Sequence, residues 1–400
     1  MPSNVSTSLW ASVLVMSVVV GVKFIEPAYA APPDKLKIGY ISTLSGPAGS
    51  IGEEMLAAYR LAIDQLGGKI GGLAVELVTG DDQAKPQTAV QLARQMIERD
   101  KVHLFSGLLF SHVVDAVNGV VLPQGRIVVA SSGGSSESAG AKCHENLFIV
   151  NWNTDTMYEA LGAHLAKQKV EKVAFVANNY QAGWDAATGF KKGYGGALAA
   201  EVLTPLDQMD FGAELTRIRA SGAAAVAYFL PGGPGIAFVR QLNQSGLSKA
   251  ASIYTASFQA DGTTFKALGD NAKGILNAGP WNPYLDNAAN KTFVTSYKAK
   301  YGQNPSVLAA MAYDTVLMLD AAITATKGEV DDPRALRQAL REAKFGSVRG
   351  RVAFGSNHFP VQNFYLSKVA DAPGGGLHNE LVATVFENKA DAHVEKCPMK

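Results

Sequence analysis

A run of small hydroxyl residues and glycines follows one of the predicted strands, and its chemistry suits an anion. The run Ser131–Ser136 (SSGGSS) comes directly after the β-rich stretch Ile127–Ala130. Ser111 stands where a helix should begin after the preceding strand, which ends at Gly107. Hydroxyl groups and free N–H groups at helix starts are good partners for a carboxylate. The spacing predicts a site for an organic acid; the alternative is that these residues only form loops and cap helices.

Aromatic side chains occur at similar positions, at predicted strand ends and in first helical turns. Flat apolar walls beside one anion site would suit a benzoate- or cinnamate-like acid. The alternative is that several of these rings pack in the core. The aromatic candidates are Phe110, His112, Trp152, Tyr180, Trp184, Phe258 and Trp281.

The sequence offers little for catalysis or metal binding. Ser111 and His112 are adjacent, and neighbours on a helix do not face each other, so they form no catalytic pair. No nucleophile elbow, Walker loop or zinc-protease motif occurs, and the 7 histidines are scattered. We therefore expect a binding protein without catalytic residues, metal or cofactor.

An alternation of strands and helices must position these residues. Short β-rich runs such as Lys35–Ser42 and Leu73–Val78 alternate with helical stretches such as Pro86–Arg99. A second series starts near Asp155 and includes the strand Lys172–Ala177. Such alternation predicts parallel sheets covered by helices on both faces. Two series in one chain predict an α/β protein with two lobes.

The last third of the chain is too small for a third α/β domain. Ser306–Thr326 is apolar nearly all round, which indicates a buried helix. Asp314 and Asp320 within it argue against a membrane span. Arg349–Phe354 and Gln362–Lys368 have the composition of strands. We expect these pieces to complete the two lobes, so that the chain crosses between them more than once.

Composition and charge limit the partners. The chain has 400 residues, 47% of them hydrophobic, which is enough for two cores of ordinary size. Lys and Arg number 36 against 35 Asp and Glu. This balance gives no indication of nucleic acid or an anionic membrane as a partner.

The N-terminus predicts export. Leu9–Val22 is an apolar run, shorter than the ~20 residues that span a bilayer. Pro27, Ala28 and Ala30 follow it, which is typical of a signal peptide over residues 1–30, cleaved after Ala30. An uncleaved anchor is the alternative, because no Lys or Arg precedes the run.

Export changes the interpretation of the cysteines. Cys143 and Cys397 are the 2 cysteines of the chain. Two cysteines in an exported protein favour a disulfide, which would tie the C-terminal tail to the first half of the chain. Two free thiols are the alternative.

Three segments resemble the branched-chain amino-acid type of periplasmic solute-binding proteins, the receptors of ABC importers. They are Ile38–Gly52, the block from Gly80 to Gly107, and Ala312–Asp314 with the apolar run after it. The likeness covers roughly residues 36 to 370. It implies a two-lobe type I periplasmic-binding-protein fold of class α/β, with parallel-sheet lobes joined by three hinge crossings.

The resemblance also implies where the crossings and lobes lie. The crossings would fall near Asn153, Pro280 and Phe345. Lobe 1 would comprise residues 31–152 and 281–345. Lobe 2 would comprise residues 153–280 and 346–400, including the C-terminal tail. Trp152 and Trp281 then stand at crossings.

The resemblance assigns roles to individual residues. In the family a first-lobe cluster holds the substrate carboxylate, and the matching positions here are Ser111, Gly134 and Ser135 or Ser136. Asp155 matches the family's acidic position after the first crossing.

The second lobe departs from the family in one place. Tyr180 matches an aromatic position of the family. The later acidic residue that helps to hold an ammonium falls near Ser257, and no acid follows before Asp261. A buried ammonium without counter-charge is unfavourable, so we expect a carboxylate ligand that lacks an α-amino group.

The segment Asn151–Asp155 resembles the aromatic-acid branch of the family. We expect Trp152 and Tyr180 above all, with Phe258 and Trp281, to contact the ligand. Asp155 would accept a hydrogen bond from a phenol hydroxyl.

The sequence thus predicts a periplasmic, monomeric receptor that closes on a small organic acid. The expected ligand is an aromatic carboxylate, the expected partner is an ABC permease of the inner membrane, and no nucleic acid is involved. A receptor for branched-chain or other amino acids is one alternative. A binding protein that serves a membrane sensor is another.

Overall fold

The computed structural model describes residues 1–3, 33–372 and 375–399. The compact unit within Pro32–Lys400 contains two sheets and is described here. The predicted signal peptide, residues 1–30, lies almost entirely outside the described residues.

Lobe 1 is built on a six-stranded sheet of order β2-β3-β1-β4-β5-β6. All neighbouring pairs are parallel except β2 with β3. The strands are β1 (Lys35–Ser42), β2 (Lys69–Ile70), β3 (Leu73–Asp81), β4 (Leu104–Gly107), β5 (Ile127–Ala130) and β6 (Leu147–Ile149). The helices are η1 (Gly46–Ala48), α1 (Gly49–Gln65), α2 (Pro86–Gln95), η2 (Met96–Asp100), α3 (Ser111–Val121), η3 (Leu122–Gln124), α4 (Ser136–Ala139), α10 (Ala288–Tyr301), α11 (Val307–Ala325) and α12 (Pro333–Arg341).

Lobe 2 is built on an eight-stranded sheet of order β12-β13-β11-β10-β9-β7-β8, with β14 paired to β13. The pairs from β8 to β11 are parallel, and the pairs of β13 are antiparallel. The strands are β7 (Val173–Asn178), β8 (Ala200–Thr204), β9 (Ala225–Phe229), β10 (Ser252–Ala256), β11 (Leu276–Gly279), β12 (Ala353–Phe354), β13 (Pro360–Asp371) and β14 (Leu377–Lys389). The helices are α5 (Thr154–Lys167), α6 (Gln181–Tyr194), α7 (Gly212–Ser221), α8 (Gly233–Gln244), η4 (Leu247–Lys249), η5 (Ser257–Gln259), α9 (Gly262–Leu268), η6 (Gly269–Ala272) and η7 (Val394–Lys396).

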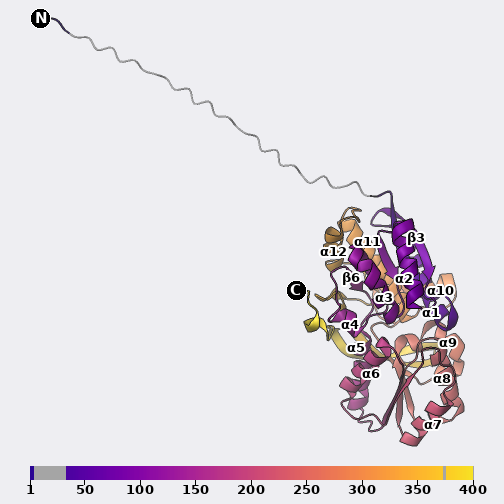
Figure 1. Ribbon diagram of the computed structural model, residues 1–400. Helices are drawn as coiled ribbons and strands as arrows, with labels where there is room; N and C mark the ends of the chain where they lie inside the picture. Colours follow the sequence, from indigo (N-terminus) through magenta and orange to yellow (C-terminus); the bar gives the residue numbers. More distant parts are fainter. Residues whose placement is uncertain (4–32, 373–374, 400) are drawn as a thin grey trace. The chain divides into compact units, whose positions relative to one another are not determined.

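The two-lobe α/β class is confirmed, but the sheets are mixed rather than wholly parallel. The antiparallel strands are at the sheet edges, where β2–β3 and β13–β14 form hairpins that need no crossover helix. Figure 1 shows α1, α2, α3, α11 and α12 around one sheet and α5 to α9 around the other.

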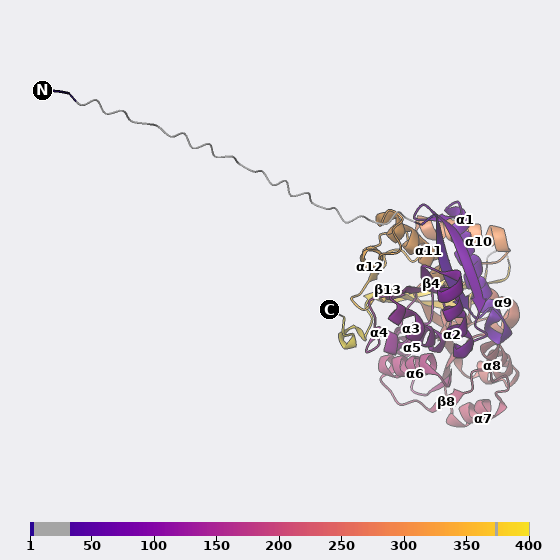
Figure 2. The same cartoon turned by 45° about the horizontal axis from the view of Figure 1, so that its top comes forward.

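The chain passes between the two lobes three times. It leaves the lobe 1 sheet after β6, returns to lobe 1 after β11, and leaves again after α12 for β12. The lobe boundaries given above remain our proposal. Figure 2 shows the third passage leading into β13.

Helix α11 is the central helix of lobe 1. It is the one helix among the described residues that is long and apolar enough to cross a membrane, and 78% of that stretch is buried inside the protein. Asp314 in its middle is fully buried and paired with Arg349. The buried ion pair of Asp314 with Arg349 and the packing of the helix against α1 identify α11 as a core helix.

The disulfide is confirmed. Cys143, which follows α4, is bonded to Cys397, which follows η7, with the two Cα atoms 5.6 Å apart. The C-terminal segment lies beside α4 in both views (Figures 1 and 2). The bond therefore joins the tail that follows the lobe 2 strand β14 to a loop of lobe 1.

Candidate ligand-binding site

A cavity lined by residues of both lobes lies between them. Its walls come from strand-end loops and first helical turns of both lobes, together with the first crossing. The lining residues are Ile51, Leu109, Phe110, Ser111, Ser132, Gly133, Asn151, Trp152, Thr154, Tyr180, Ala182, Phe229, Pro231, Phe258 and Leu308.

Lobe 1 contributes polar groups at the ends of two neighbouring strands. β4 and β5 are parallel, so the segments that follow them emerge at the same edge of the sheet. Ser111 begins α3 and is 2% exposed, and its Oγ lacks a hydrogen-bond partner in the described structure. The first N–H groups of a helix have no partner within it. This edge therefore offers a hydroxyl and main-chain N–H groups to an anion.

Two glycines keep the loop after β5 close to its neighbours. Gly133 has φ +74°, and a Cβ there would lie 2.3 Å from Cγ2 of Val114. A Cβ on Gly134 would lie 2.1 Å from the carbonyl oxygen of Trp152. Any larger residue would displace the backbone, so the two glycines fix the wall that Ser132 and Gly133 form.

Lobe 2 and the first crossing contribute aromatic rings. The Trp152 ring stacks on Phe258 with centroids 6.2 Å apart. Tyr180 lies 6.1 Å from Phe229 and reaches across to Phe110 of lobe 1 at 6.2 Å. These rings form a flat apolar space opposite the hydroxyl edge.

The described lining contains no Asp, Glu, Lys or Arg. Burial raises the pKa of the Tyr180 hydroxyl, which therefore stays protonated and can donate a hydrogen bond. Burial lowers the pKa of His112, whose ring packs edge-on against Tyr180 at 5.3 Å, so its imidazole is neutral near pH 7. An anion here would be held by neutral donors rather than by an ion pair.

Of the predicted binding residues, Ser111, Trp152, Tyr180 and Phe258 line the cavity. Gly134, Ser135 and Ser136 lie just beyond the lining. Ser135 caps α4, and its Oγ accepts from the N–H of Ser138 at 3.1 Å. The N–H and O–H of Ser136 both donate to Asp185, at 2.9 and 2.6 Å. Both hydroxyls already have partners, and Ser132 and Gly133, earlier in the loop, line the cavity instead; the anion contact of Gly134, Ser135 and Ser136 stays a prediction.

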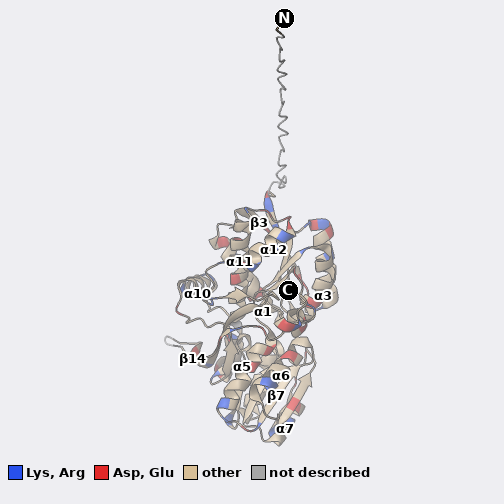
Figure 3. Cartoon of the chain, turned by 90° about the vertical axis from the view of Figure 1, so that its left-hand side faces the viewer, with Lys and Arg blue, Asp and Glu red and all other residues tan. Residues whose placement is uncertain are grey.

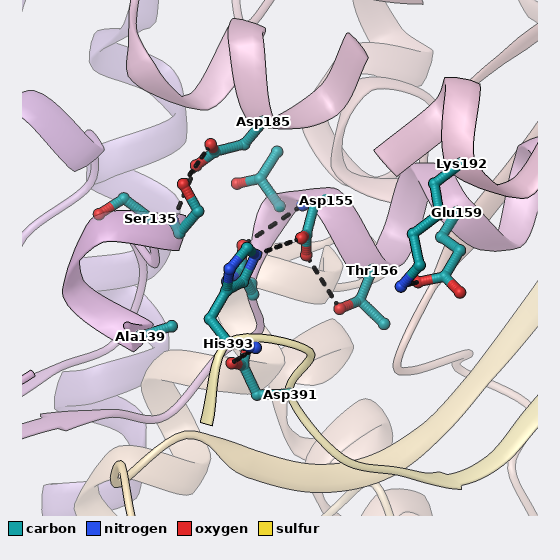
Figure 4. A network of polar contacts seen from close by, with 12 residues as sticks. Ser135, Ala139, Asp155, Thr156, Glu159, Asp185, Lys192, Asp391 and His393 are labelled. Atoms are coloured by element: carbon teal, nitrogen blue, oxygen red, sulfur yellow. Dashed lines mark hydrogen bonds and ion pairs between the residues drawn. The ribbon is translucent and has the colours of Figure 1, made fainter. Parts of the chain in front are cut away.

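Asp155 also lies outside the lining. Its Oδ2 is 2.6 Å from Nε2 of His393, and its Oδ1 accepts from Thr156 at 3.1 Å (Figure 4). The hydrogen bond to Asp155 raises the pKa of His393. The carboxylate therefore faces the C-terminal tail, and its expected contact with a phenol hydroxyl stays a prediction.

Trp281 is a packing residue of the second crossing. It is 4% exposed, and its indole N–H donates to Oδ1 of Asn290 at 2.7 Å. Its ring packs against Phe293 at 6.1 Å. It borders a separate polar cavity next to Ser257 and Asp261 rather than the cavity between the lobes, and its expected ligand contact stays a prediction.

Sequence reasoning missed several lining residues. Phe229 ends β9 and Pro231 follows it, so both reach the same edge as the other strand-end residues. The rule that ligands lie beyond the carboxyl ends of parallel strands could have found them. Asn151 was named only as part of a motif, yet its buried Oδ1 has no hydrogen-bond partner in the described structure.

A buried ion pair supports the crossings beneath the cavity. Nε of Arg349 lies 2.9 Å from Oδ2 of Asp314, and the two side chains are 1% and 0% exposed. The same guanidinium donates to the carbonyl of Val150 at 2.9 Å and to Gln362 at 2.5 Å. Hydrogen bonds beyond the ion pair offset the cost of burying it, although Nη2 of Arg349 has no partner among the described residues. The pair therefore connects the first and third crossings.

Among the described residues, no group of three or more His, Cys, Asp or Glu could hold a metal ion. Figure 3 shows Lys and Arg interspersed with Asp and Glu over both lobes.

Comparisons with known proteins agree with this architecture. The family described as periplasmic binding protein matches residues 35–375. A protein of Brucella melitensis named Leu/Ile/Val-binding protein homolog 6 is 31% identical over 378 residues, which cover 91% of this chain and 95% of the relative.

Solved structures give a similar result. A solute-binding protein of an ABC transporter from R. palustris, in complex with benzoate, superposes with a TM-score of 0.86 at 27% identity and covers 91% of this chain and 100% of its own. Another, from Rhodopseudomonas palustris BisB5 in complex with 3,4-dihydroxybenzoic acid, has a TM-score of 0.84 at 27% identity and covers 90% and 99%. The matched family consists of binding components of transporters, which confirms that the protein is not an enzyme.

Proposed function

We propose that this chain, which belongs to the periplasmic binding protein family, captures a small aromatic carboxylate outside the cytoplasm and delivers it to an ABC permease. Solute-binding proteins of this kind bind small ligands in the cleft between two lobes and pass them to a membrane partner. We further propose that the chain is exported through residues 1–30 and acts as a monomer.

The observation that carries the proposal is the absence of charged side chains from the described cavity lining. An α-amino acid brings a buried ammonium as well as a carboxylate, and no lining carboxylate would compensate it. A benzoate-like acid needs only donors for its carboxylate and apolar walls for its ring. Ser111 with the N-terminus of α3 supplies the former, and Trp152, Tyr180, Phe229 and Phe258 supply the latter.

Three relationships support the aromatic acid. Benzoate and 3,4-dihydroxybenzoic acid are the ligands of two structural relatives. The unpartnered Oδ1 of Asn151 could accept from a ring hydroxyl, the role expected earlier for Asp155. The neutral lining would accept a benzoate without requiring any counter-ion.

A receptor for branched-chain amino acids is the second candidate, favoured by the name of the Brucella relative. The deciding experiment compares pairs of ligands that differ in one group, on residues 31–400 freed of co-purified ligand by partial unfolding and refolding. 3-Phenylpropanoate and phenylalanine differ only in the α-ammonium. Benzoate and benzamide have the same ring and differ in the group it carries, an anionic carboxylate in one and a neutral amide in the other. Leucine and valine complete the panel.

We expect saturating benzoate and 3-phenylpropanoate to raise the melting temperature. A ligand concentration of one hundred times Kd stabilises the folded protein by about 2.7 kcal/mol. Phenylalanine, benzamide and leucine should produce no shift. Isothermal titration calorimetry would then give the affinities. A shift with leucine and phenylalanine, and none with the aromatic acids, would refute the aromatic-acid proposal in favour of the amino-acid receptor. Uptake of radiolabelled benzoate in cells that lack the gene tests whether the protein serves a transporter or a membrane sensor.

A further inference from the structure

Two carboxylates of lobe 2 reach across the cleft to main-chain N–H groups of lobe 1. The first is Asp185 of α6. Its Oδ2 accepts from the N–H of Ser136 at 2.9 Å, and its Oδ1 accepts from the hydroxyl of Ser136 at 2.6 Å and from Gln181 at 2.9 Å. Figure 4 shows Asp185 directed from its helix toward the segment that begins at Ser135.

The second carboxylate is Asp261, the residue that precedes α9. Its Oδ2 accepts from the N–H of Val307 at 2.8 Å, and Val307 is the first residue of the lobe 1 helix α11. Glu54 of lobe 1 accepts from the neighbouring Ser306 N–H at 2.9 Å. The start of α11 is therefore held by one acid from each lobe.

Neither Asp185 nor Asp261 lines the cavity, yet each stands next to residues that do. Ala182 lies on the same helix as Asp185, and Leu308 directly follows Val307. The two contacts therefore lie at different parts of the cavity rim. Both acids are 5% exposed, so they lose most of their hydration where the lobes meet.

Hinge opening separates lobe 1 from lobe 2 and must break both contacts. Hydrogen bonds that involve a carboxylate are stronger than neutral ones, and a buried donor left without a partner is unfavourable. Both effects favour the closed arrangement.

We propose that Asp185 and Asp261 are closure residues: they hold the two lobes together and set the affinity for every ligand by the same factor, without contacting the ligand. The proposal adds to the proposed function the residues that control closure, and it rests on that function only in requiring a hinge that closes.

The first test measures the distance between the lobes without ligand. Spin labels are placed on cysteines introduced at the exposed Arg94 of α2 and Arg217 of α7, and pulsed electron paramagnetic resonance gives the distance distribution. We expect Asp185→Ala to reduce the closed fraction about tenfold. Asp207→Ala, at an exposed acid of lobe 2, is the matched control and should leave the distribution as in the unaltered protein. An unchanged distribution in Asp185→Ala overturns the proposal.

The second test uses ligand kinetics with benzoate and 4-hydroxybenzoate as probes. Asp185→Ala should raise both Kd values by the same factor, about tenfold, mainly through faster dissociation. Asp185→Asn keeps an acceptor for the Ser136 N–H and should restore the affinity. A loss confined to one probe would indicate direct contact with the ligand and would overturn the closure role.

Further variants keep the test informative if Asp185→Ala fails to fold. Ser136→Ala removes only the hydroxyl donor and should weaken closure less than Asp185→Ala; the double variant should lose no more than Asp185→Ala alone. Asp261→Asn keeps the cap of α9 and the acceptor for Val307, whereas Asp261→Ala removes both. If neither probe binds the unaltered protein, the proposed ligand class fails, while the distance measurement still decides the closure role.

Discussion

The two walls of the cavity are built from different parts of the chain. The lobe 1 wall consists of loops after β4 and β5, with N–H groups, the Ser111 hydroxyl and Gly133, and Gly134 lies just behind it. The wall opposite consists of side-chain rings, among them Tyr180 and Phe258. A wall made of backbone tolerates few substitutions, since each change moves the chain itself. A wall made of side chains can change its selectivity without disturbing the fold.

The largest expected loss of affinity comes from Gly134→Ala. The added Cβ would meet the carbonyl oxygen of Trp152 at 2.1 Å, so the loop and the crossing must separate. We expect about 2 kcal/mol of lost stability, as for other overpacked sites, and a loss of benzoate affinity larger than about a hundredfold, which corresponds to 2.7 kcal/mol. Chemical unfolding and calorimetry measure the two effects.

Gly119→Ala is the matched control for Gly134→Ala. Gly119 lies in α3, where a Cβ would meet nothing within 4 Å. Alanine is the better helix former, so this variant should gain up to about 1 kcal/mol of stability and bind benzoate normally. Equal behaviour of the two variants would contradict the tight backbone contact.

The second-largest expected effect distinguishes the roles of two tryptophans at the crossings between the lobes. Trp152→Ala should lower benzoate affinity about thirtyfold through loss of about 2 kcal/mol of apolar contact, because its ring lines the cavity. Trp281→Ala should cost about 3–5 kcal/mol of stability, because its ring packs with Phe293 and its N–H is bonded to Asn290. Affinity in Trp281→Ala should change less than about twofold where the protein is folded. The reverse pattern would exchange the roles assigned to the two rings.

These tryptophans also show what the sequence could and could not predict. Both stand at a crossing between lobes, and both are aromatic residues after a strand, so residue type and position along the chain are the same. Whether a ring faces the ligand depends on a partner far from the crossing itself, such as Phe258 for Trp152. Local pattern does not contain that information.

The fold was easier to predict than the site, because strand and helix periodicity is a local property. The alternation of strands such as Lys35–Ser42 with helices identified both lobes. The apolar stretch Ser306–Thr326 identified the core helix. Antiparallel edges were missed because a hairpin strand such as β14 has the same composition as a parallel one. The pair Asp314–Arg349 was missed because its partners are 35 residues apart and meet only in the folded chain.

The serine loop shows the same limit at finer scale. SSGGSS identified the correct loop, yet the hydroxyls of Ser135 and Ser136 point to Ser138 and Asp185 rather than to the cavity. Helix capping and ligand binding use the same residue types. Residue type alone therefore cannot decide whether Ser132 or Ser136, a few positions apart, faces the cavity.

The third effect tests the hydroxyl of the backbone wall. Ser111→Ala should lower benzoate affinity about tenfold, the effect of one hydrogen bond to a charged group. In the ligand-free protein the Oγ is buried without a partner among the described residues, so the variant should be as stable as the unaltered protein or more stable. Thermal melts with and without benzoate separate the two effects. A variant that loses stability but keeps its affinity would show that Ser111 is structural.

The smallest expected effect is a pH dependence that arises outside both walls. The described lining contains no charged side chain, so titration of the cavity itself contributes little near neutral pH. Burial raises the pKa of Asp185, which faces Asp155, and of Asp261, which faces Glu54. Asp115 lies near Asp185 and has Glu137 and Lys142 beside it, and His393 is bonded to Asp155.

The sign of this dependence follows from the raised pKa values. When the lobes separate, both carboxylates become hydrated and their pKa values return toward 3.8, so the closed state binds more protons than the open state. Closure, and with it benzoate affinity, should therefore increase as the pH falls from above the raised pKa values toward 3.8. We expect about a threefold increase between pH 8 and pH 5, a free-energy change of about 0.6 kcal/mol. In Asp185→Asn with Asp261→Asn the side chains do not titrate, and the affinity should vary less over this range. Calorimetry in buffers of equal ionic strength tests this, and an affinity that falls with decreasing pH in the unaltered protein would contradict the prediction. An unchanged pH dependence in the double variant would assign the effect to another group, such as His393, whose pKa is also raised.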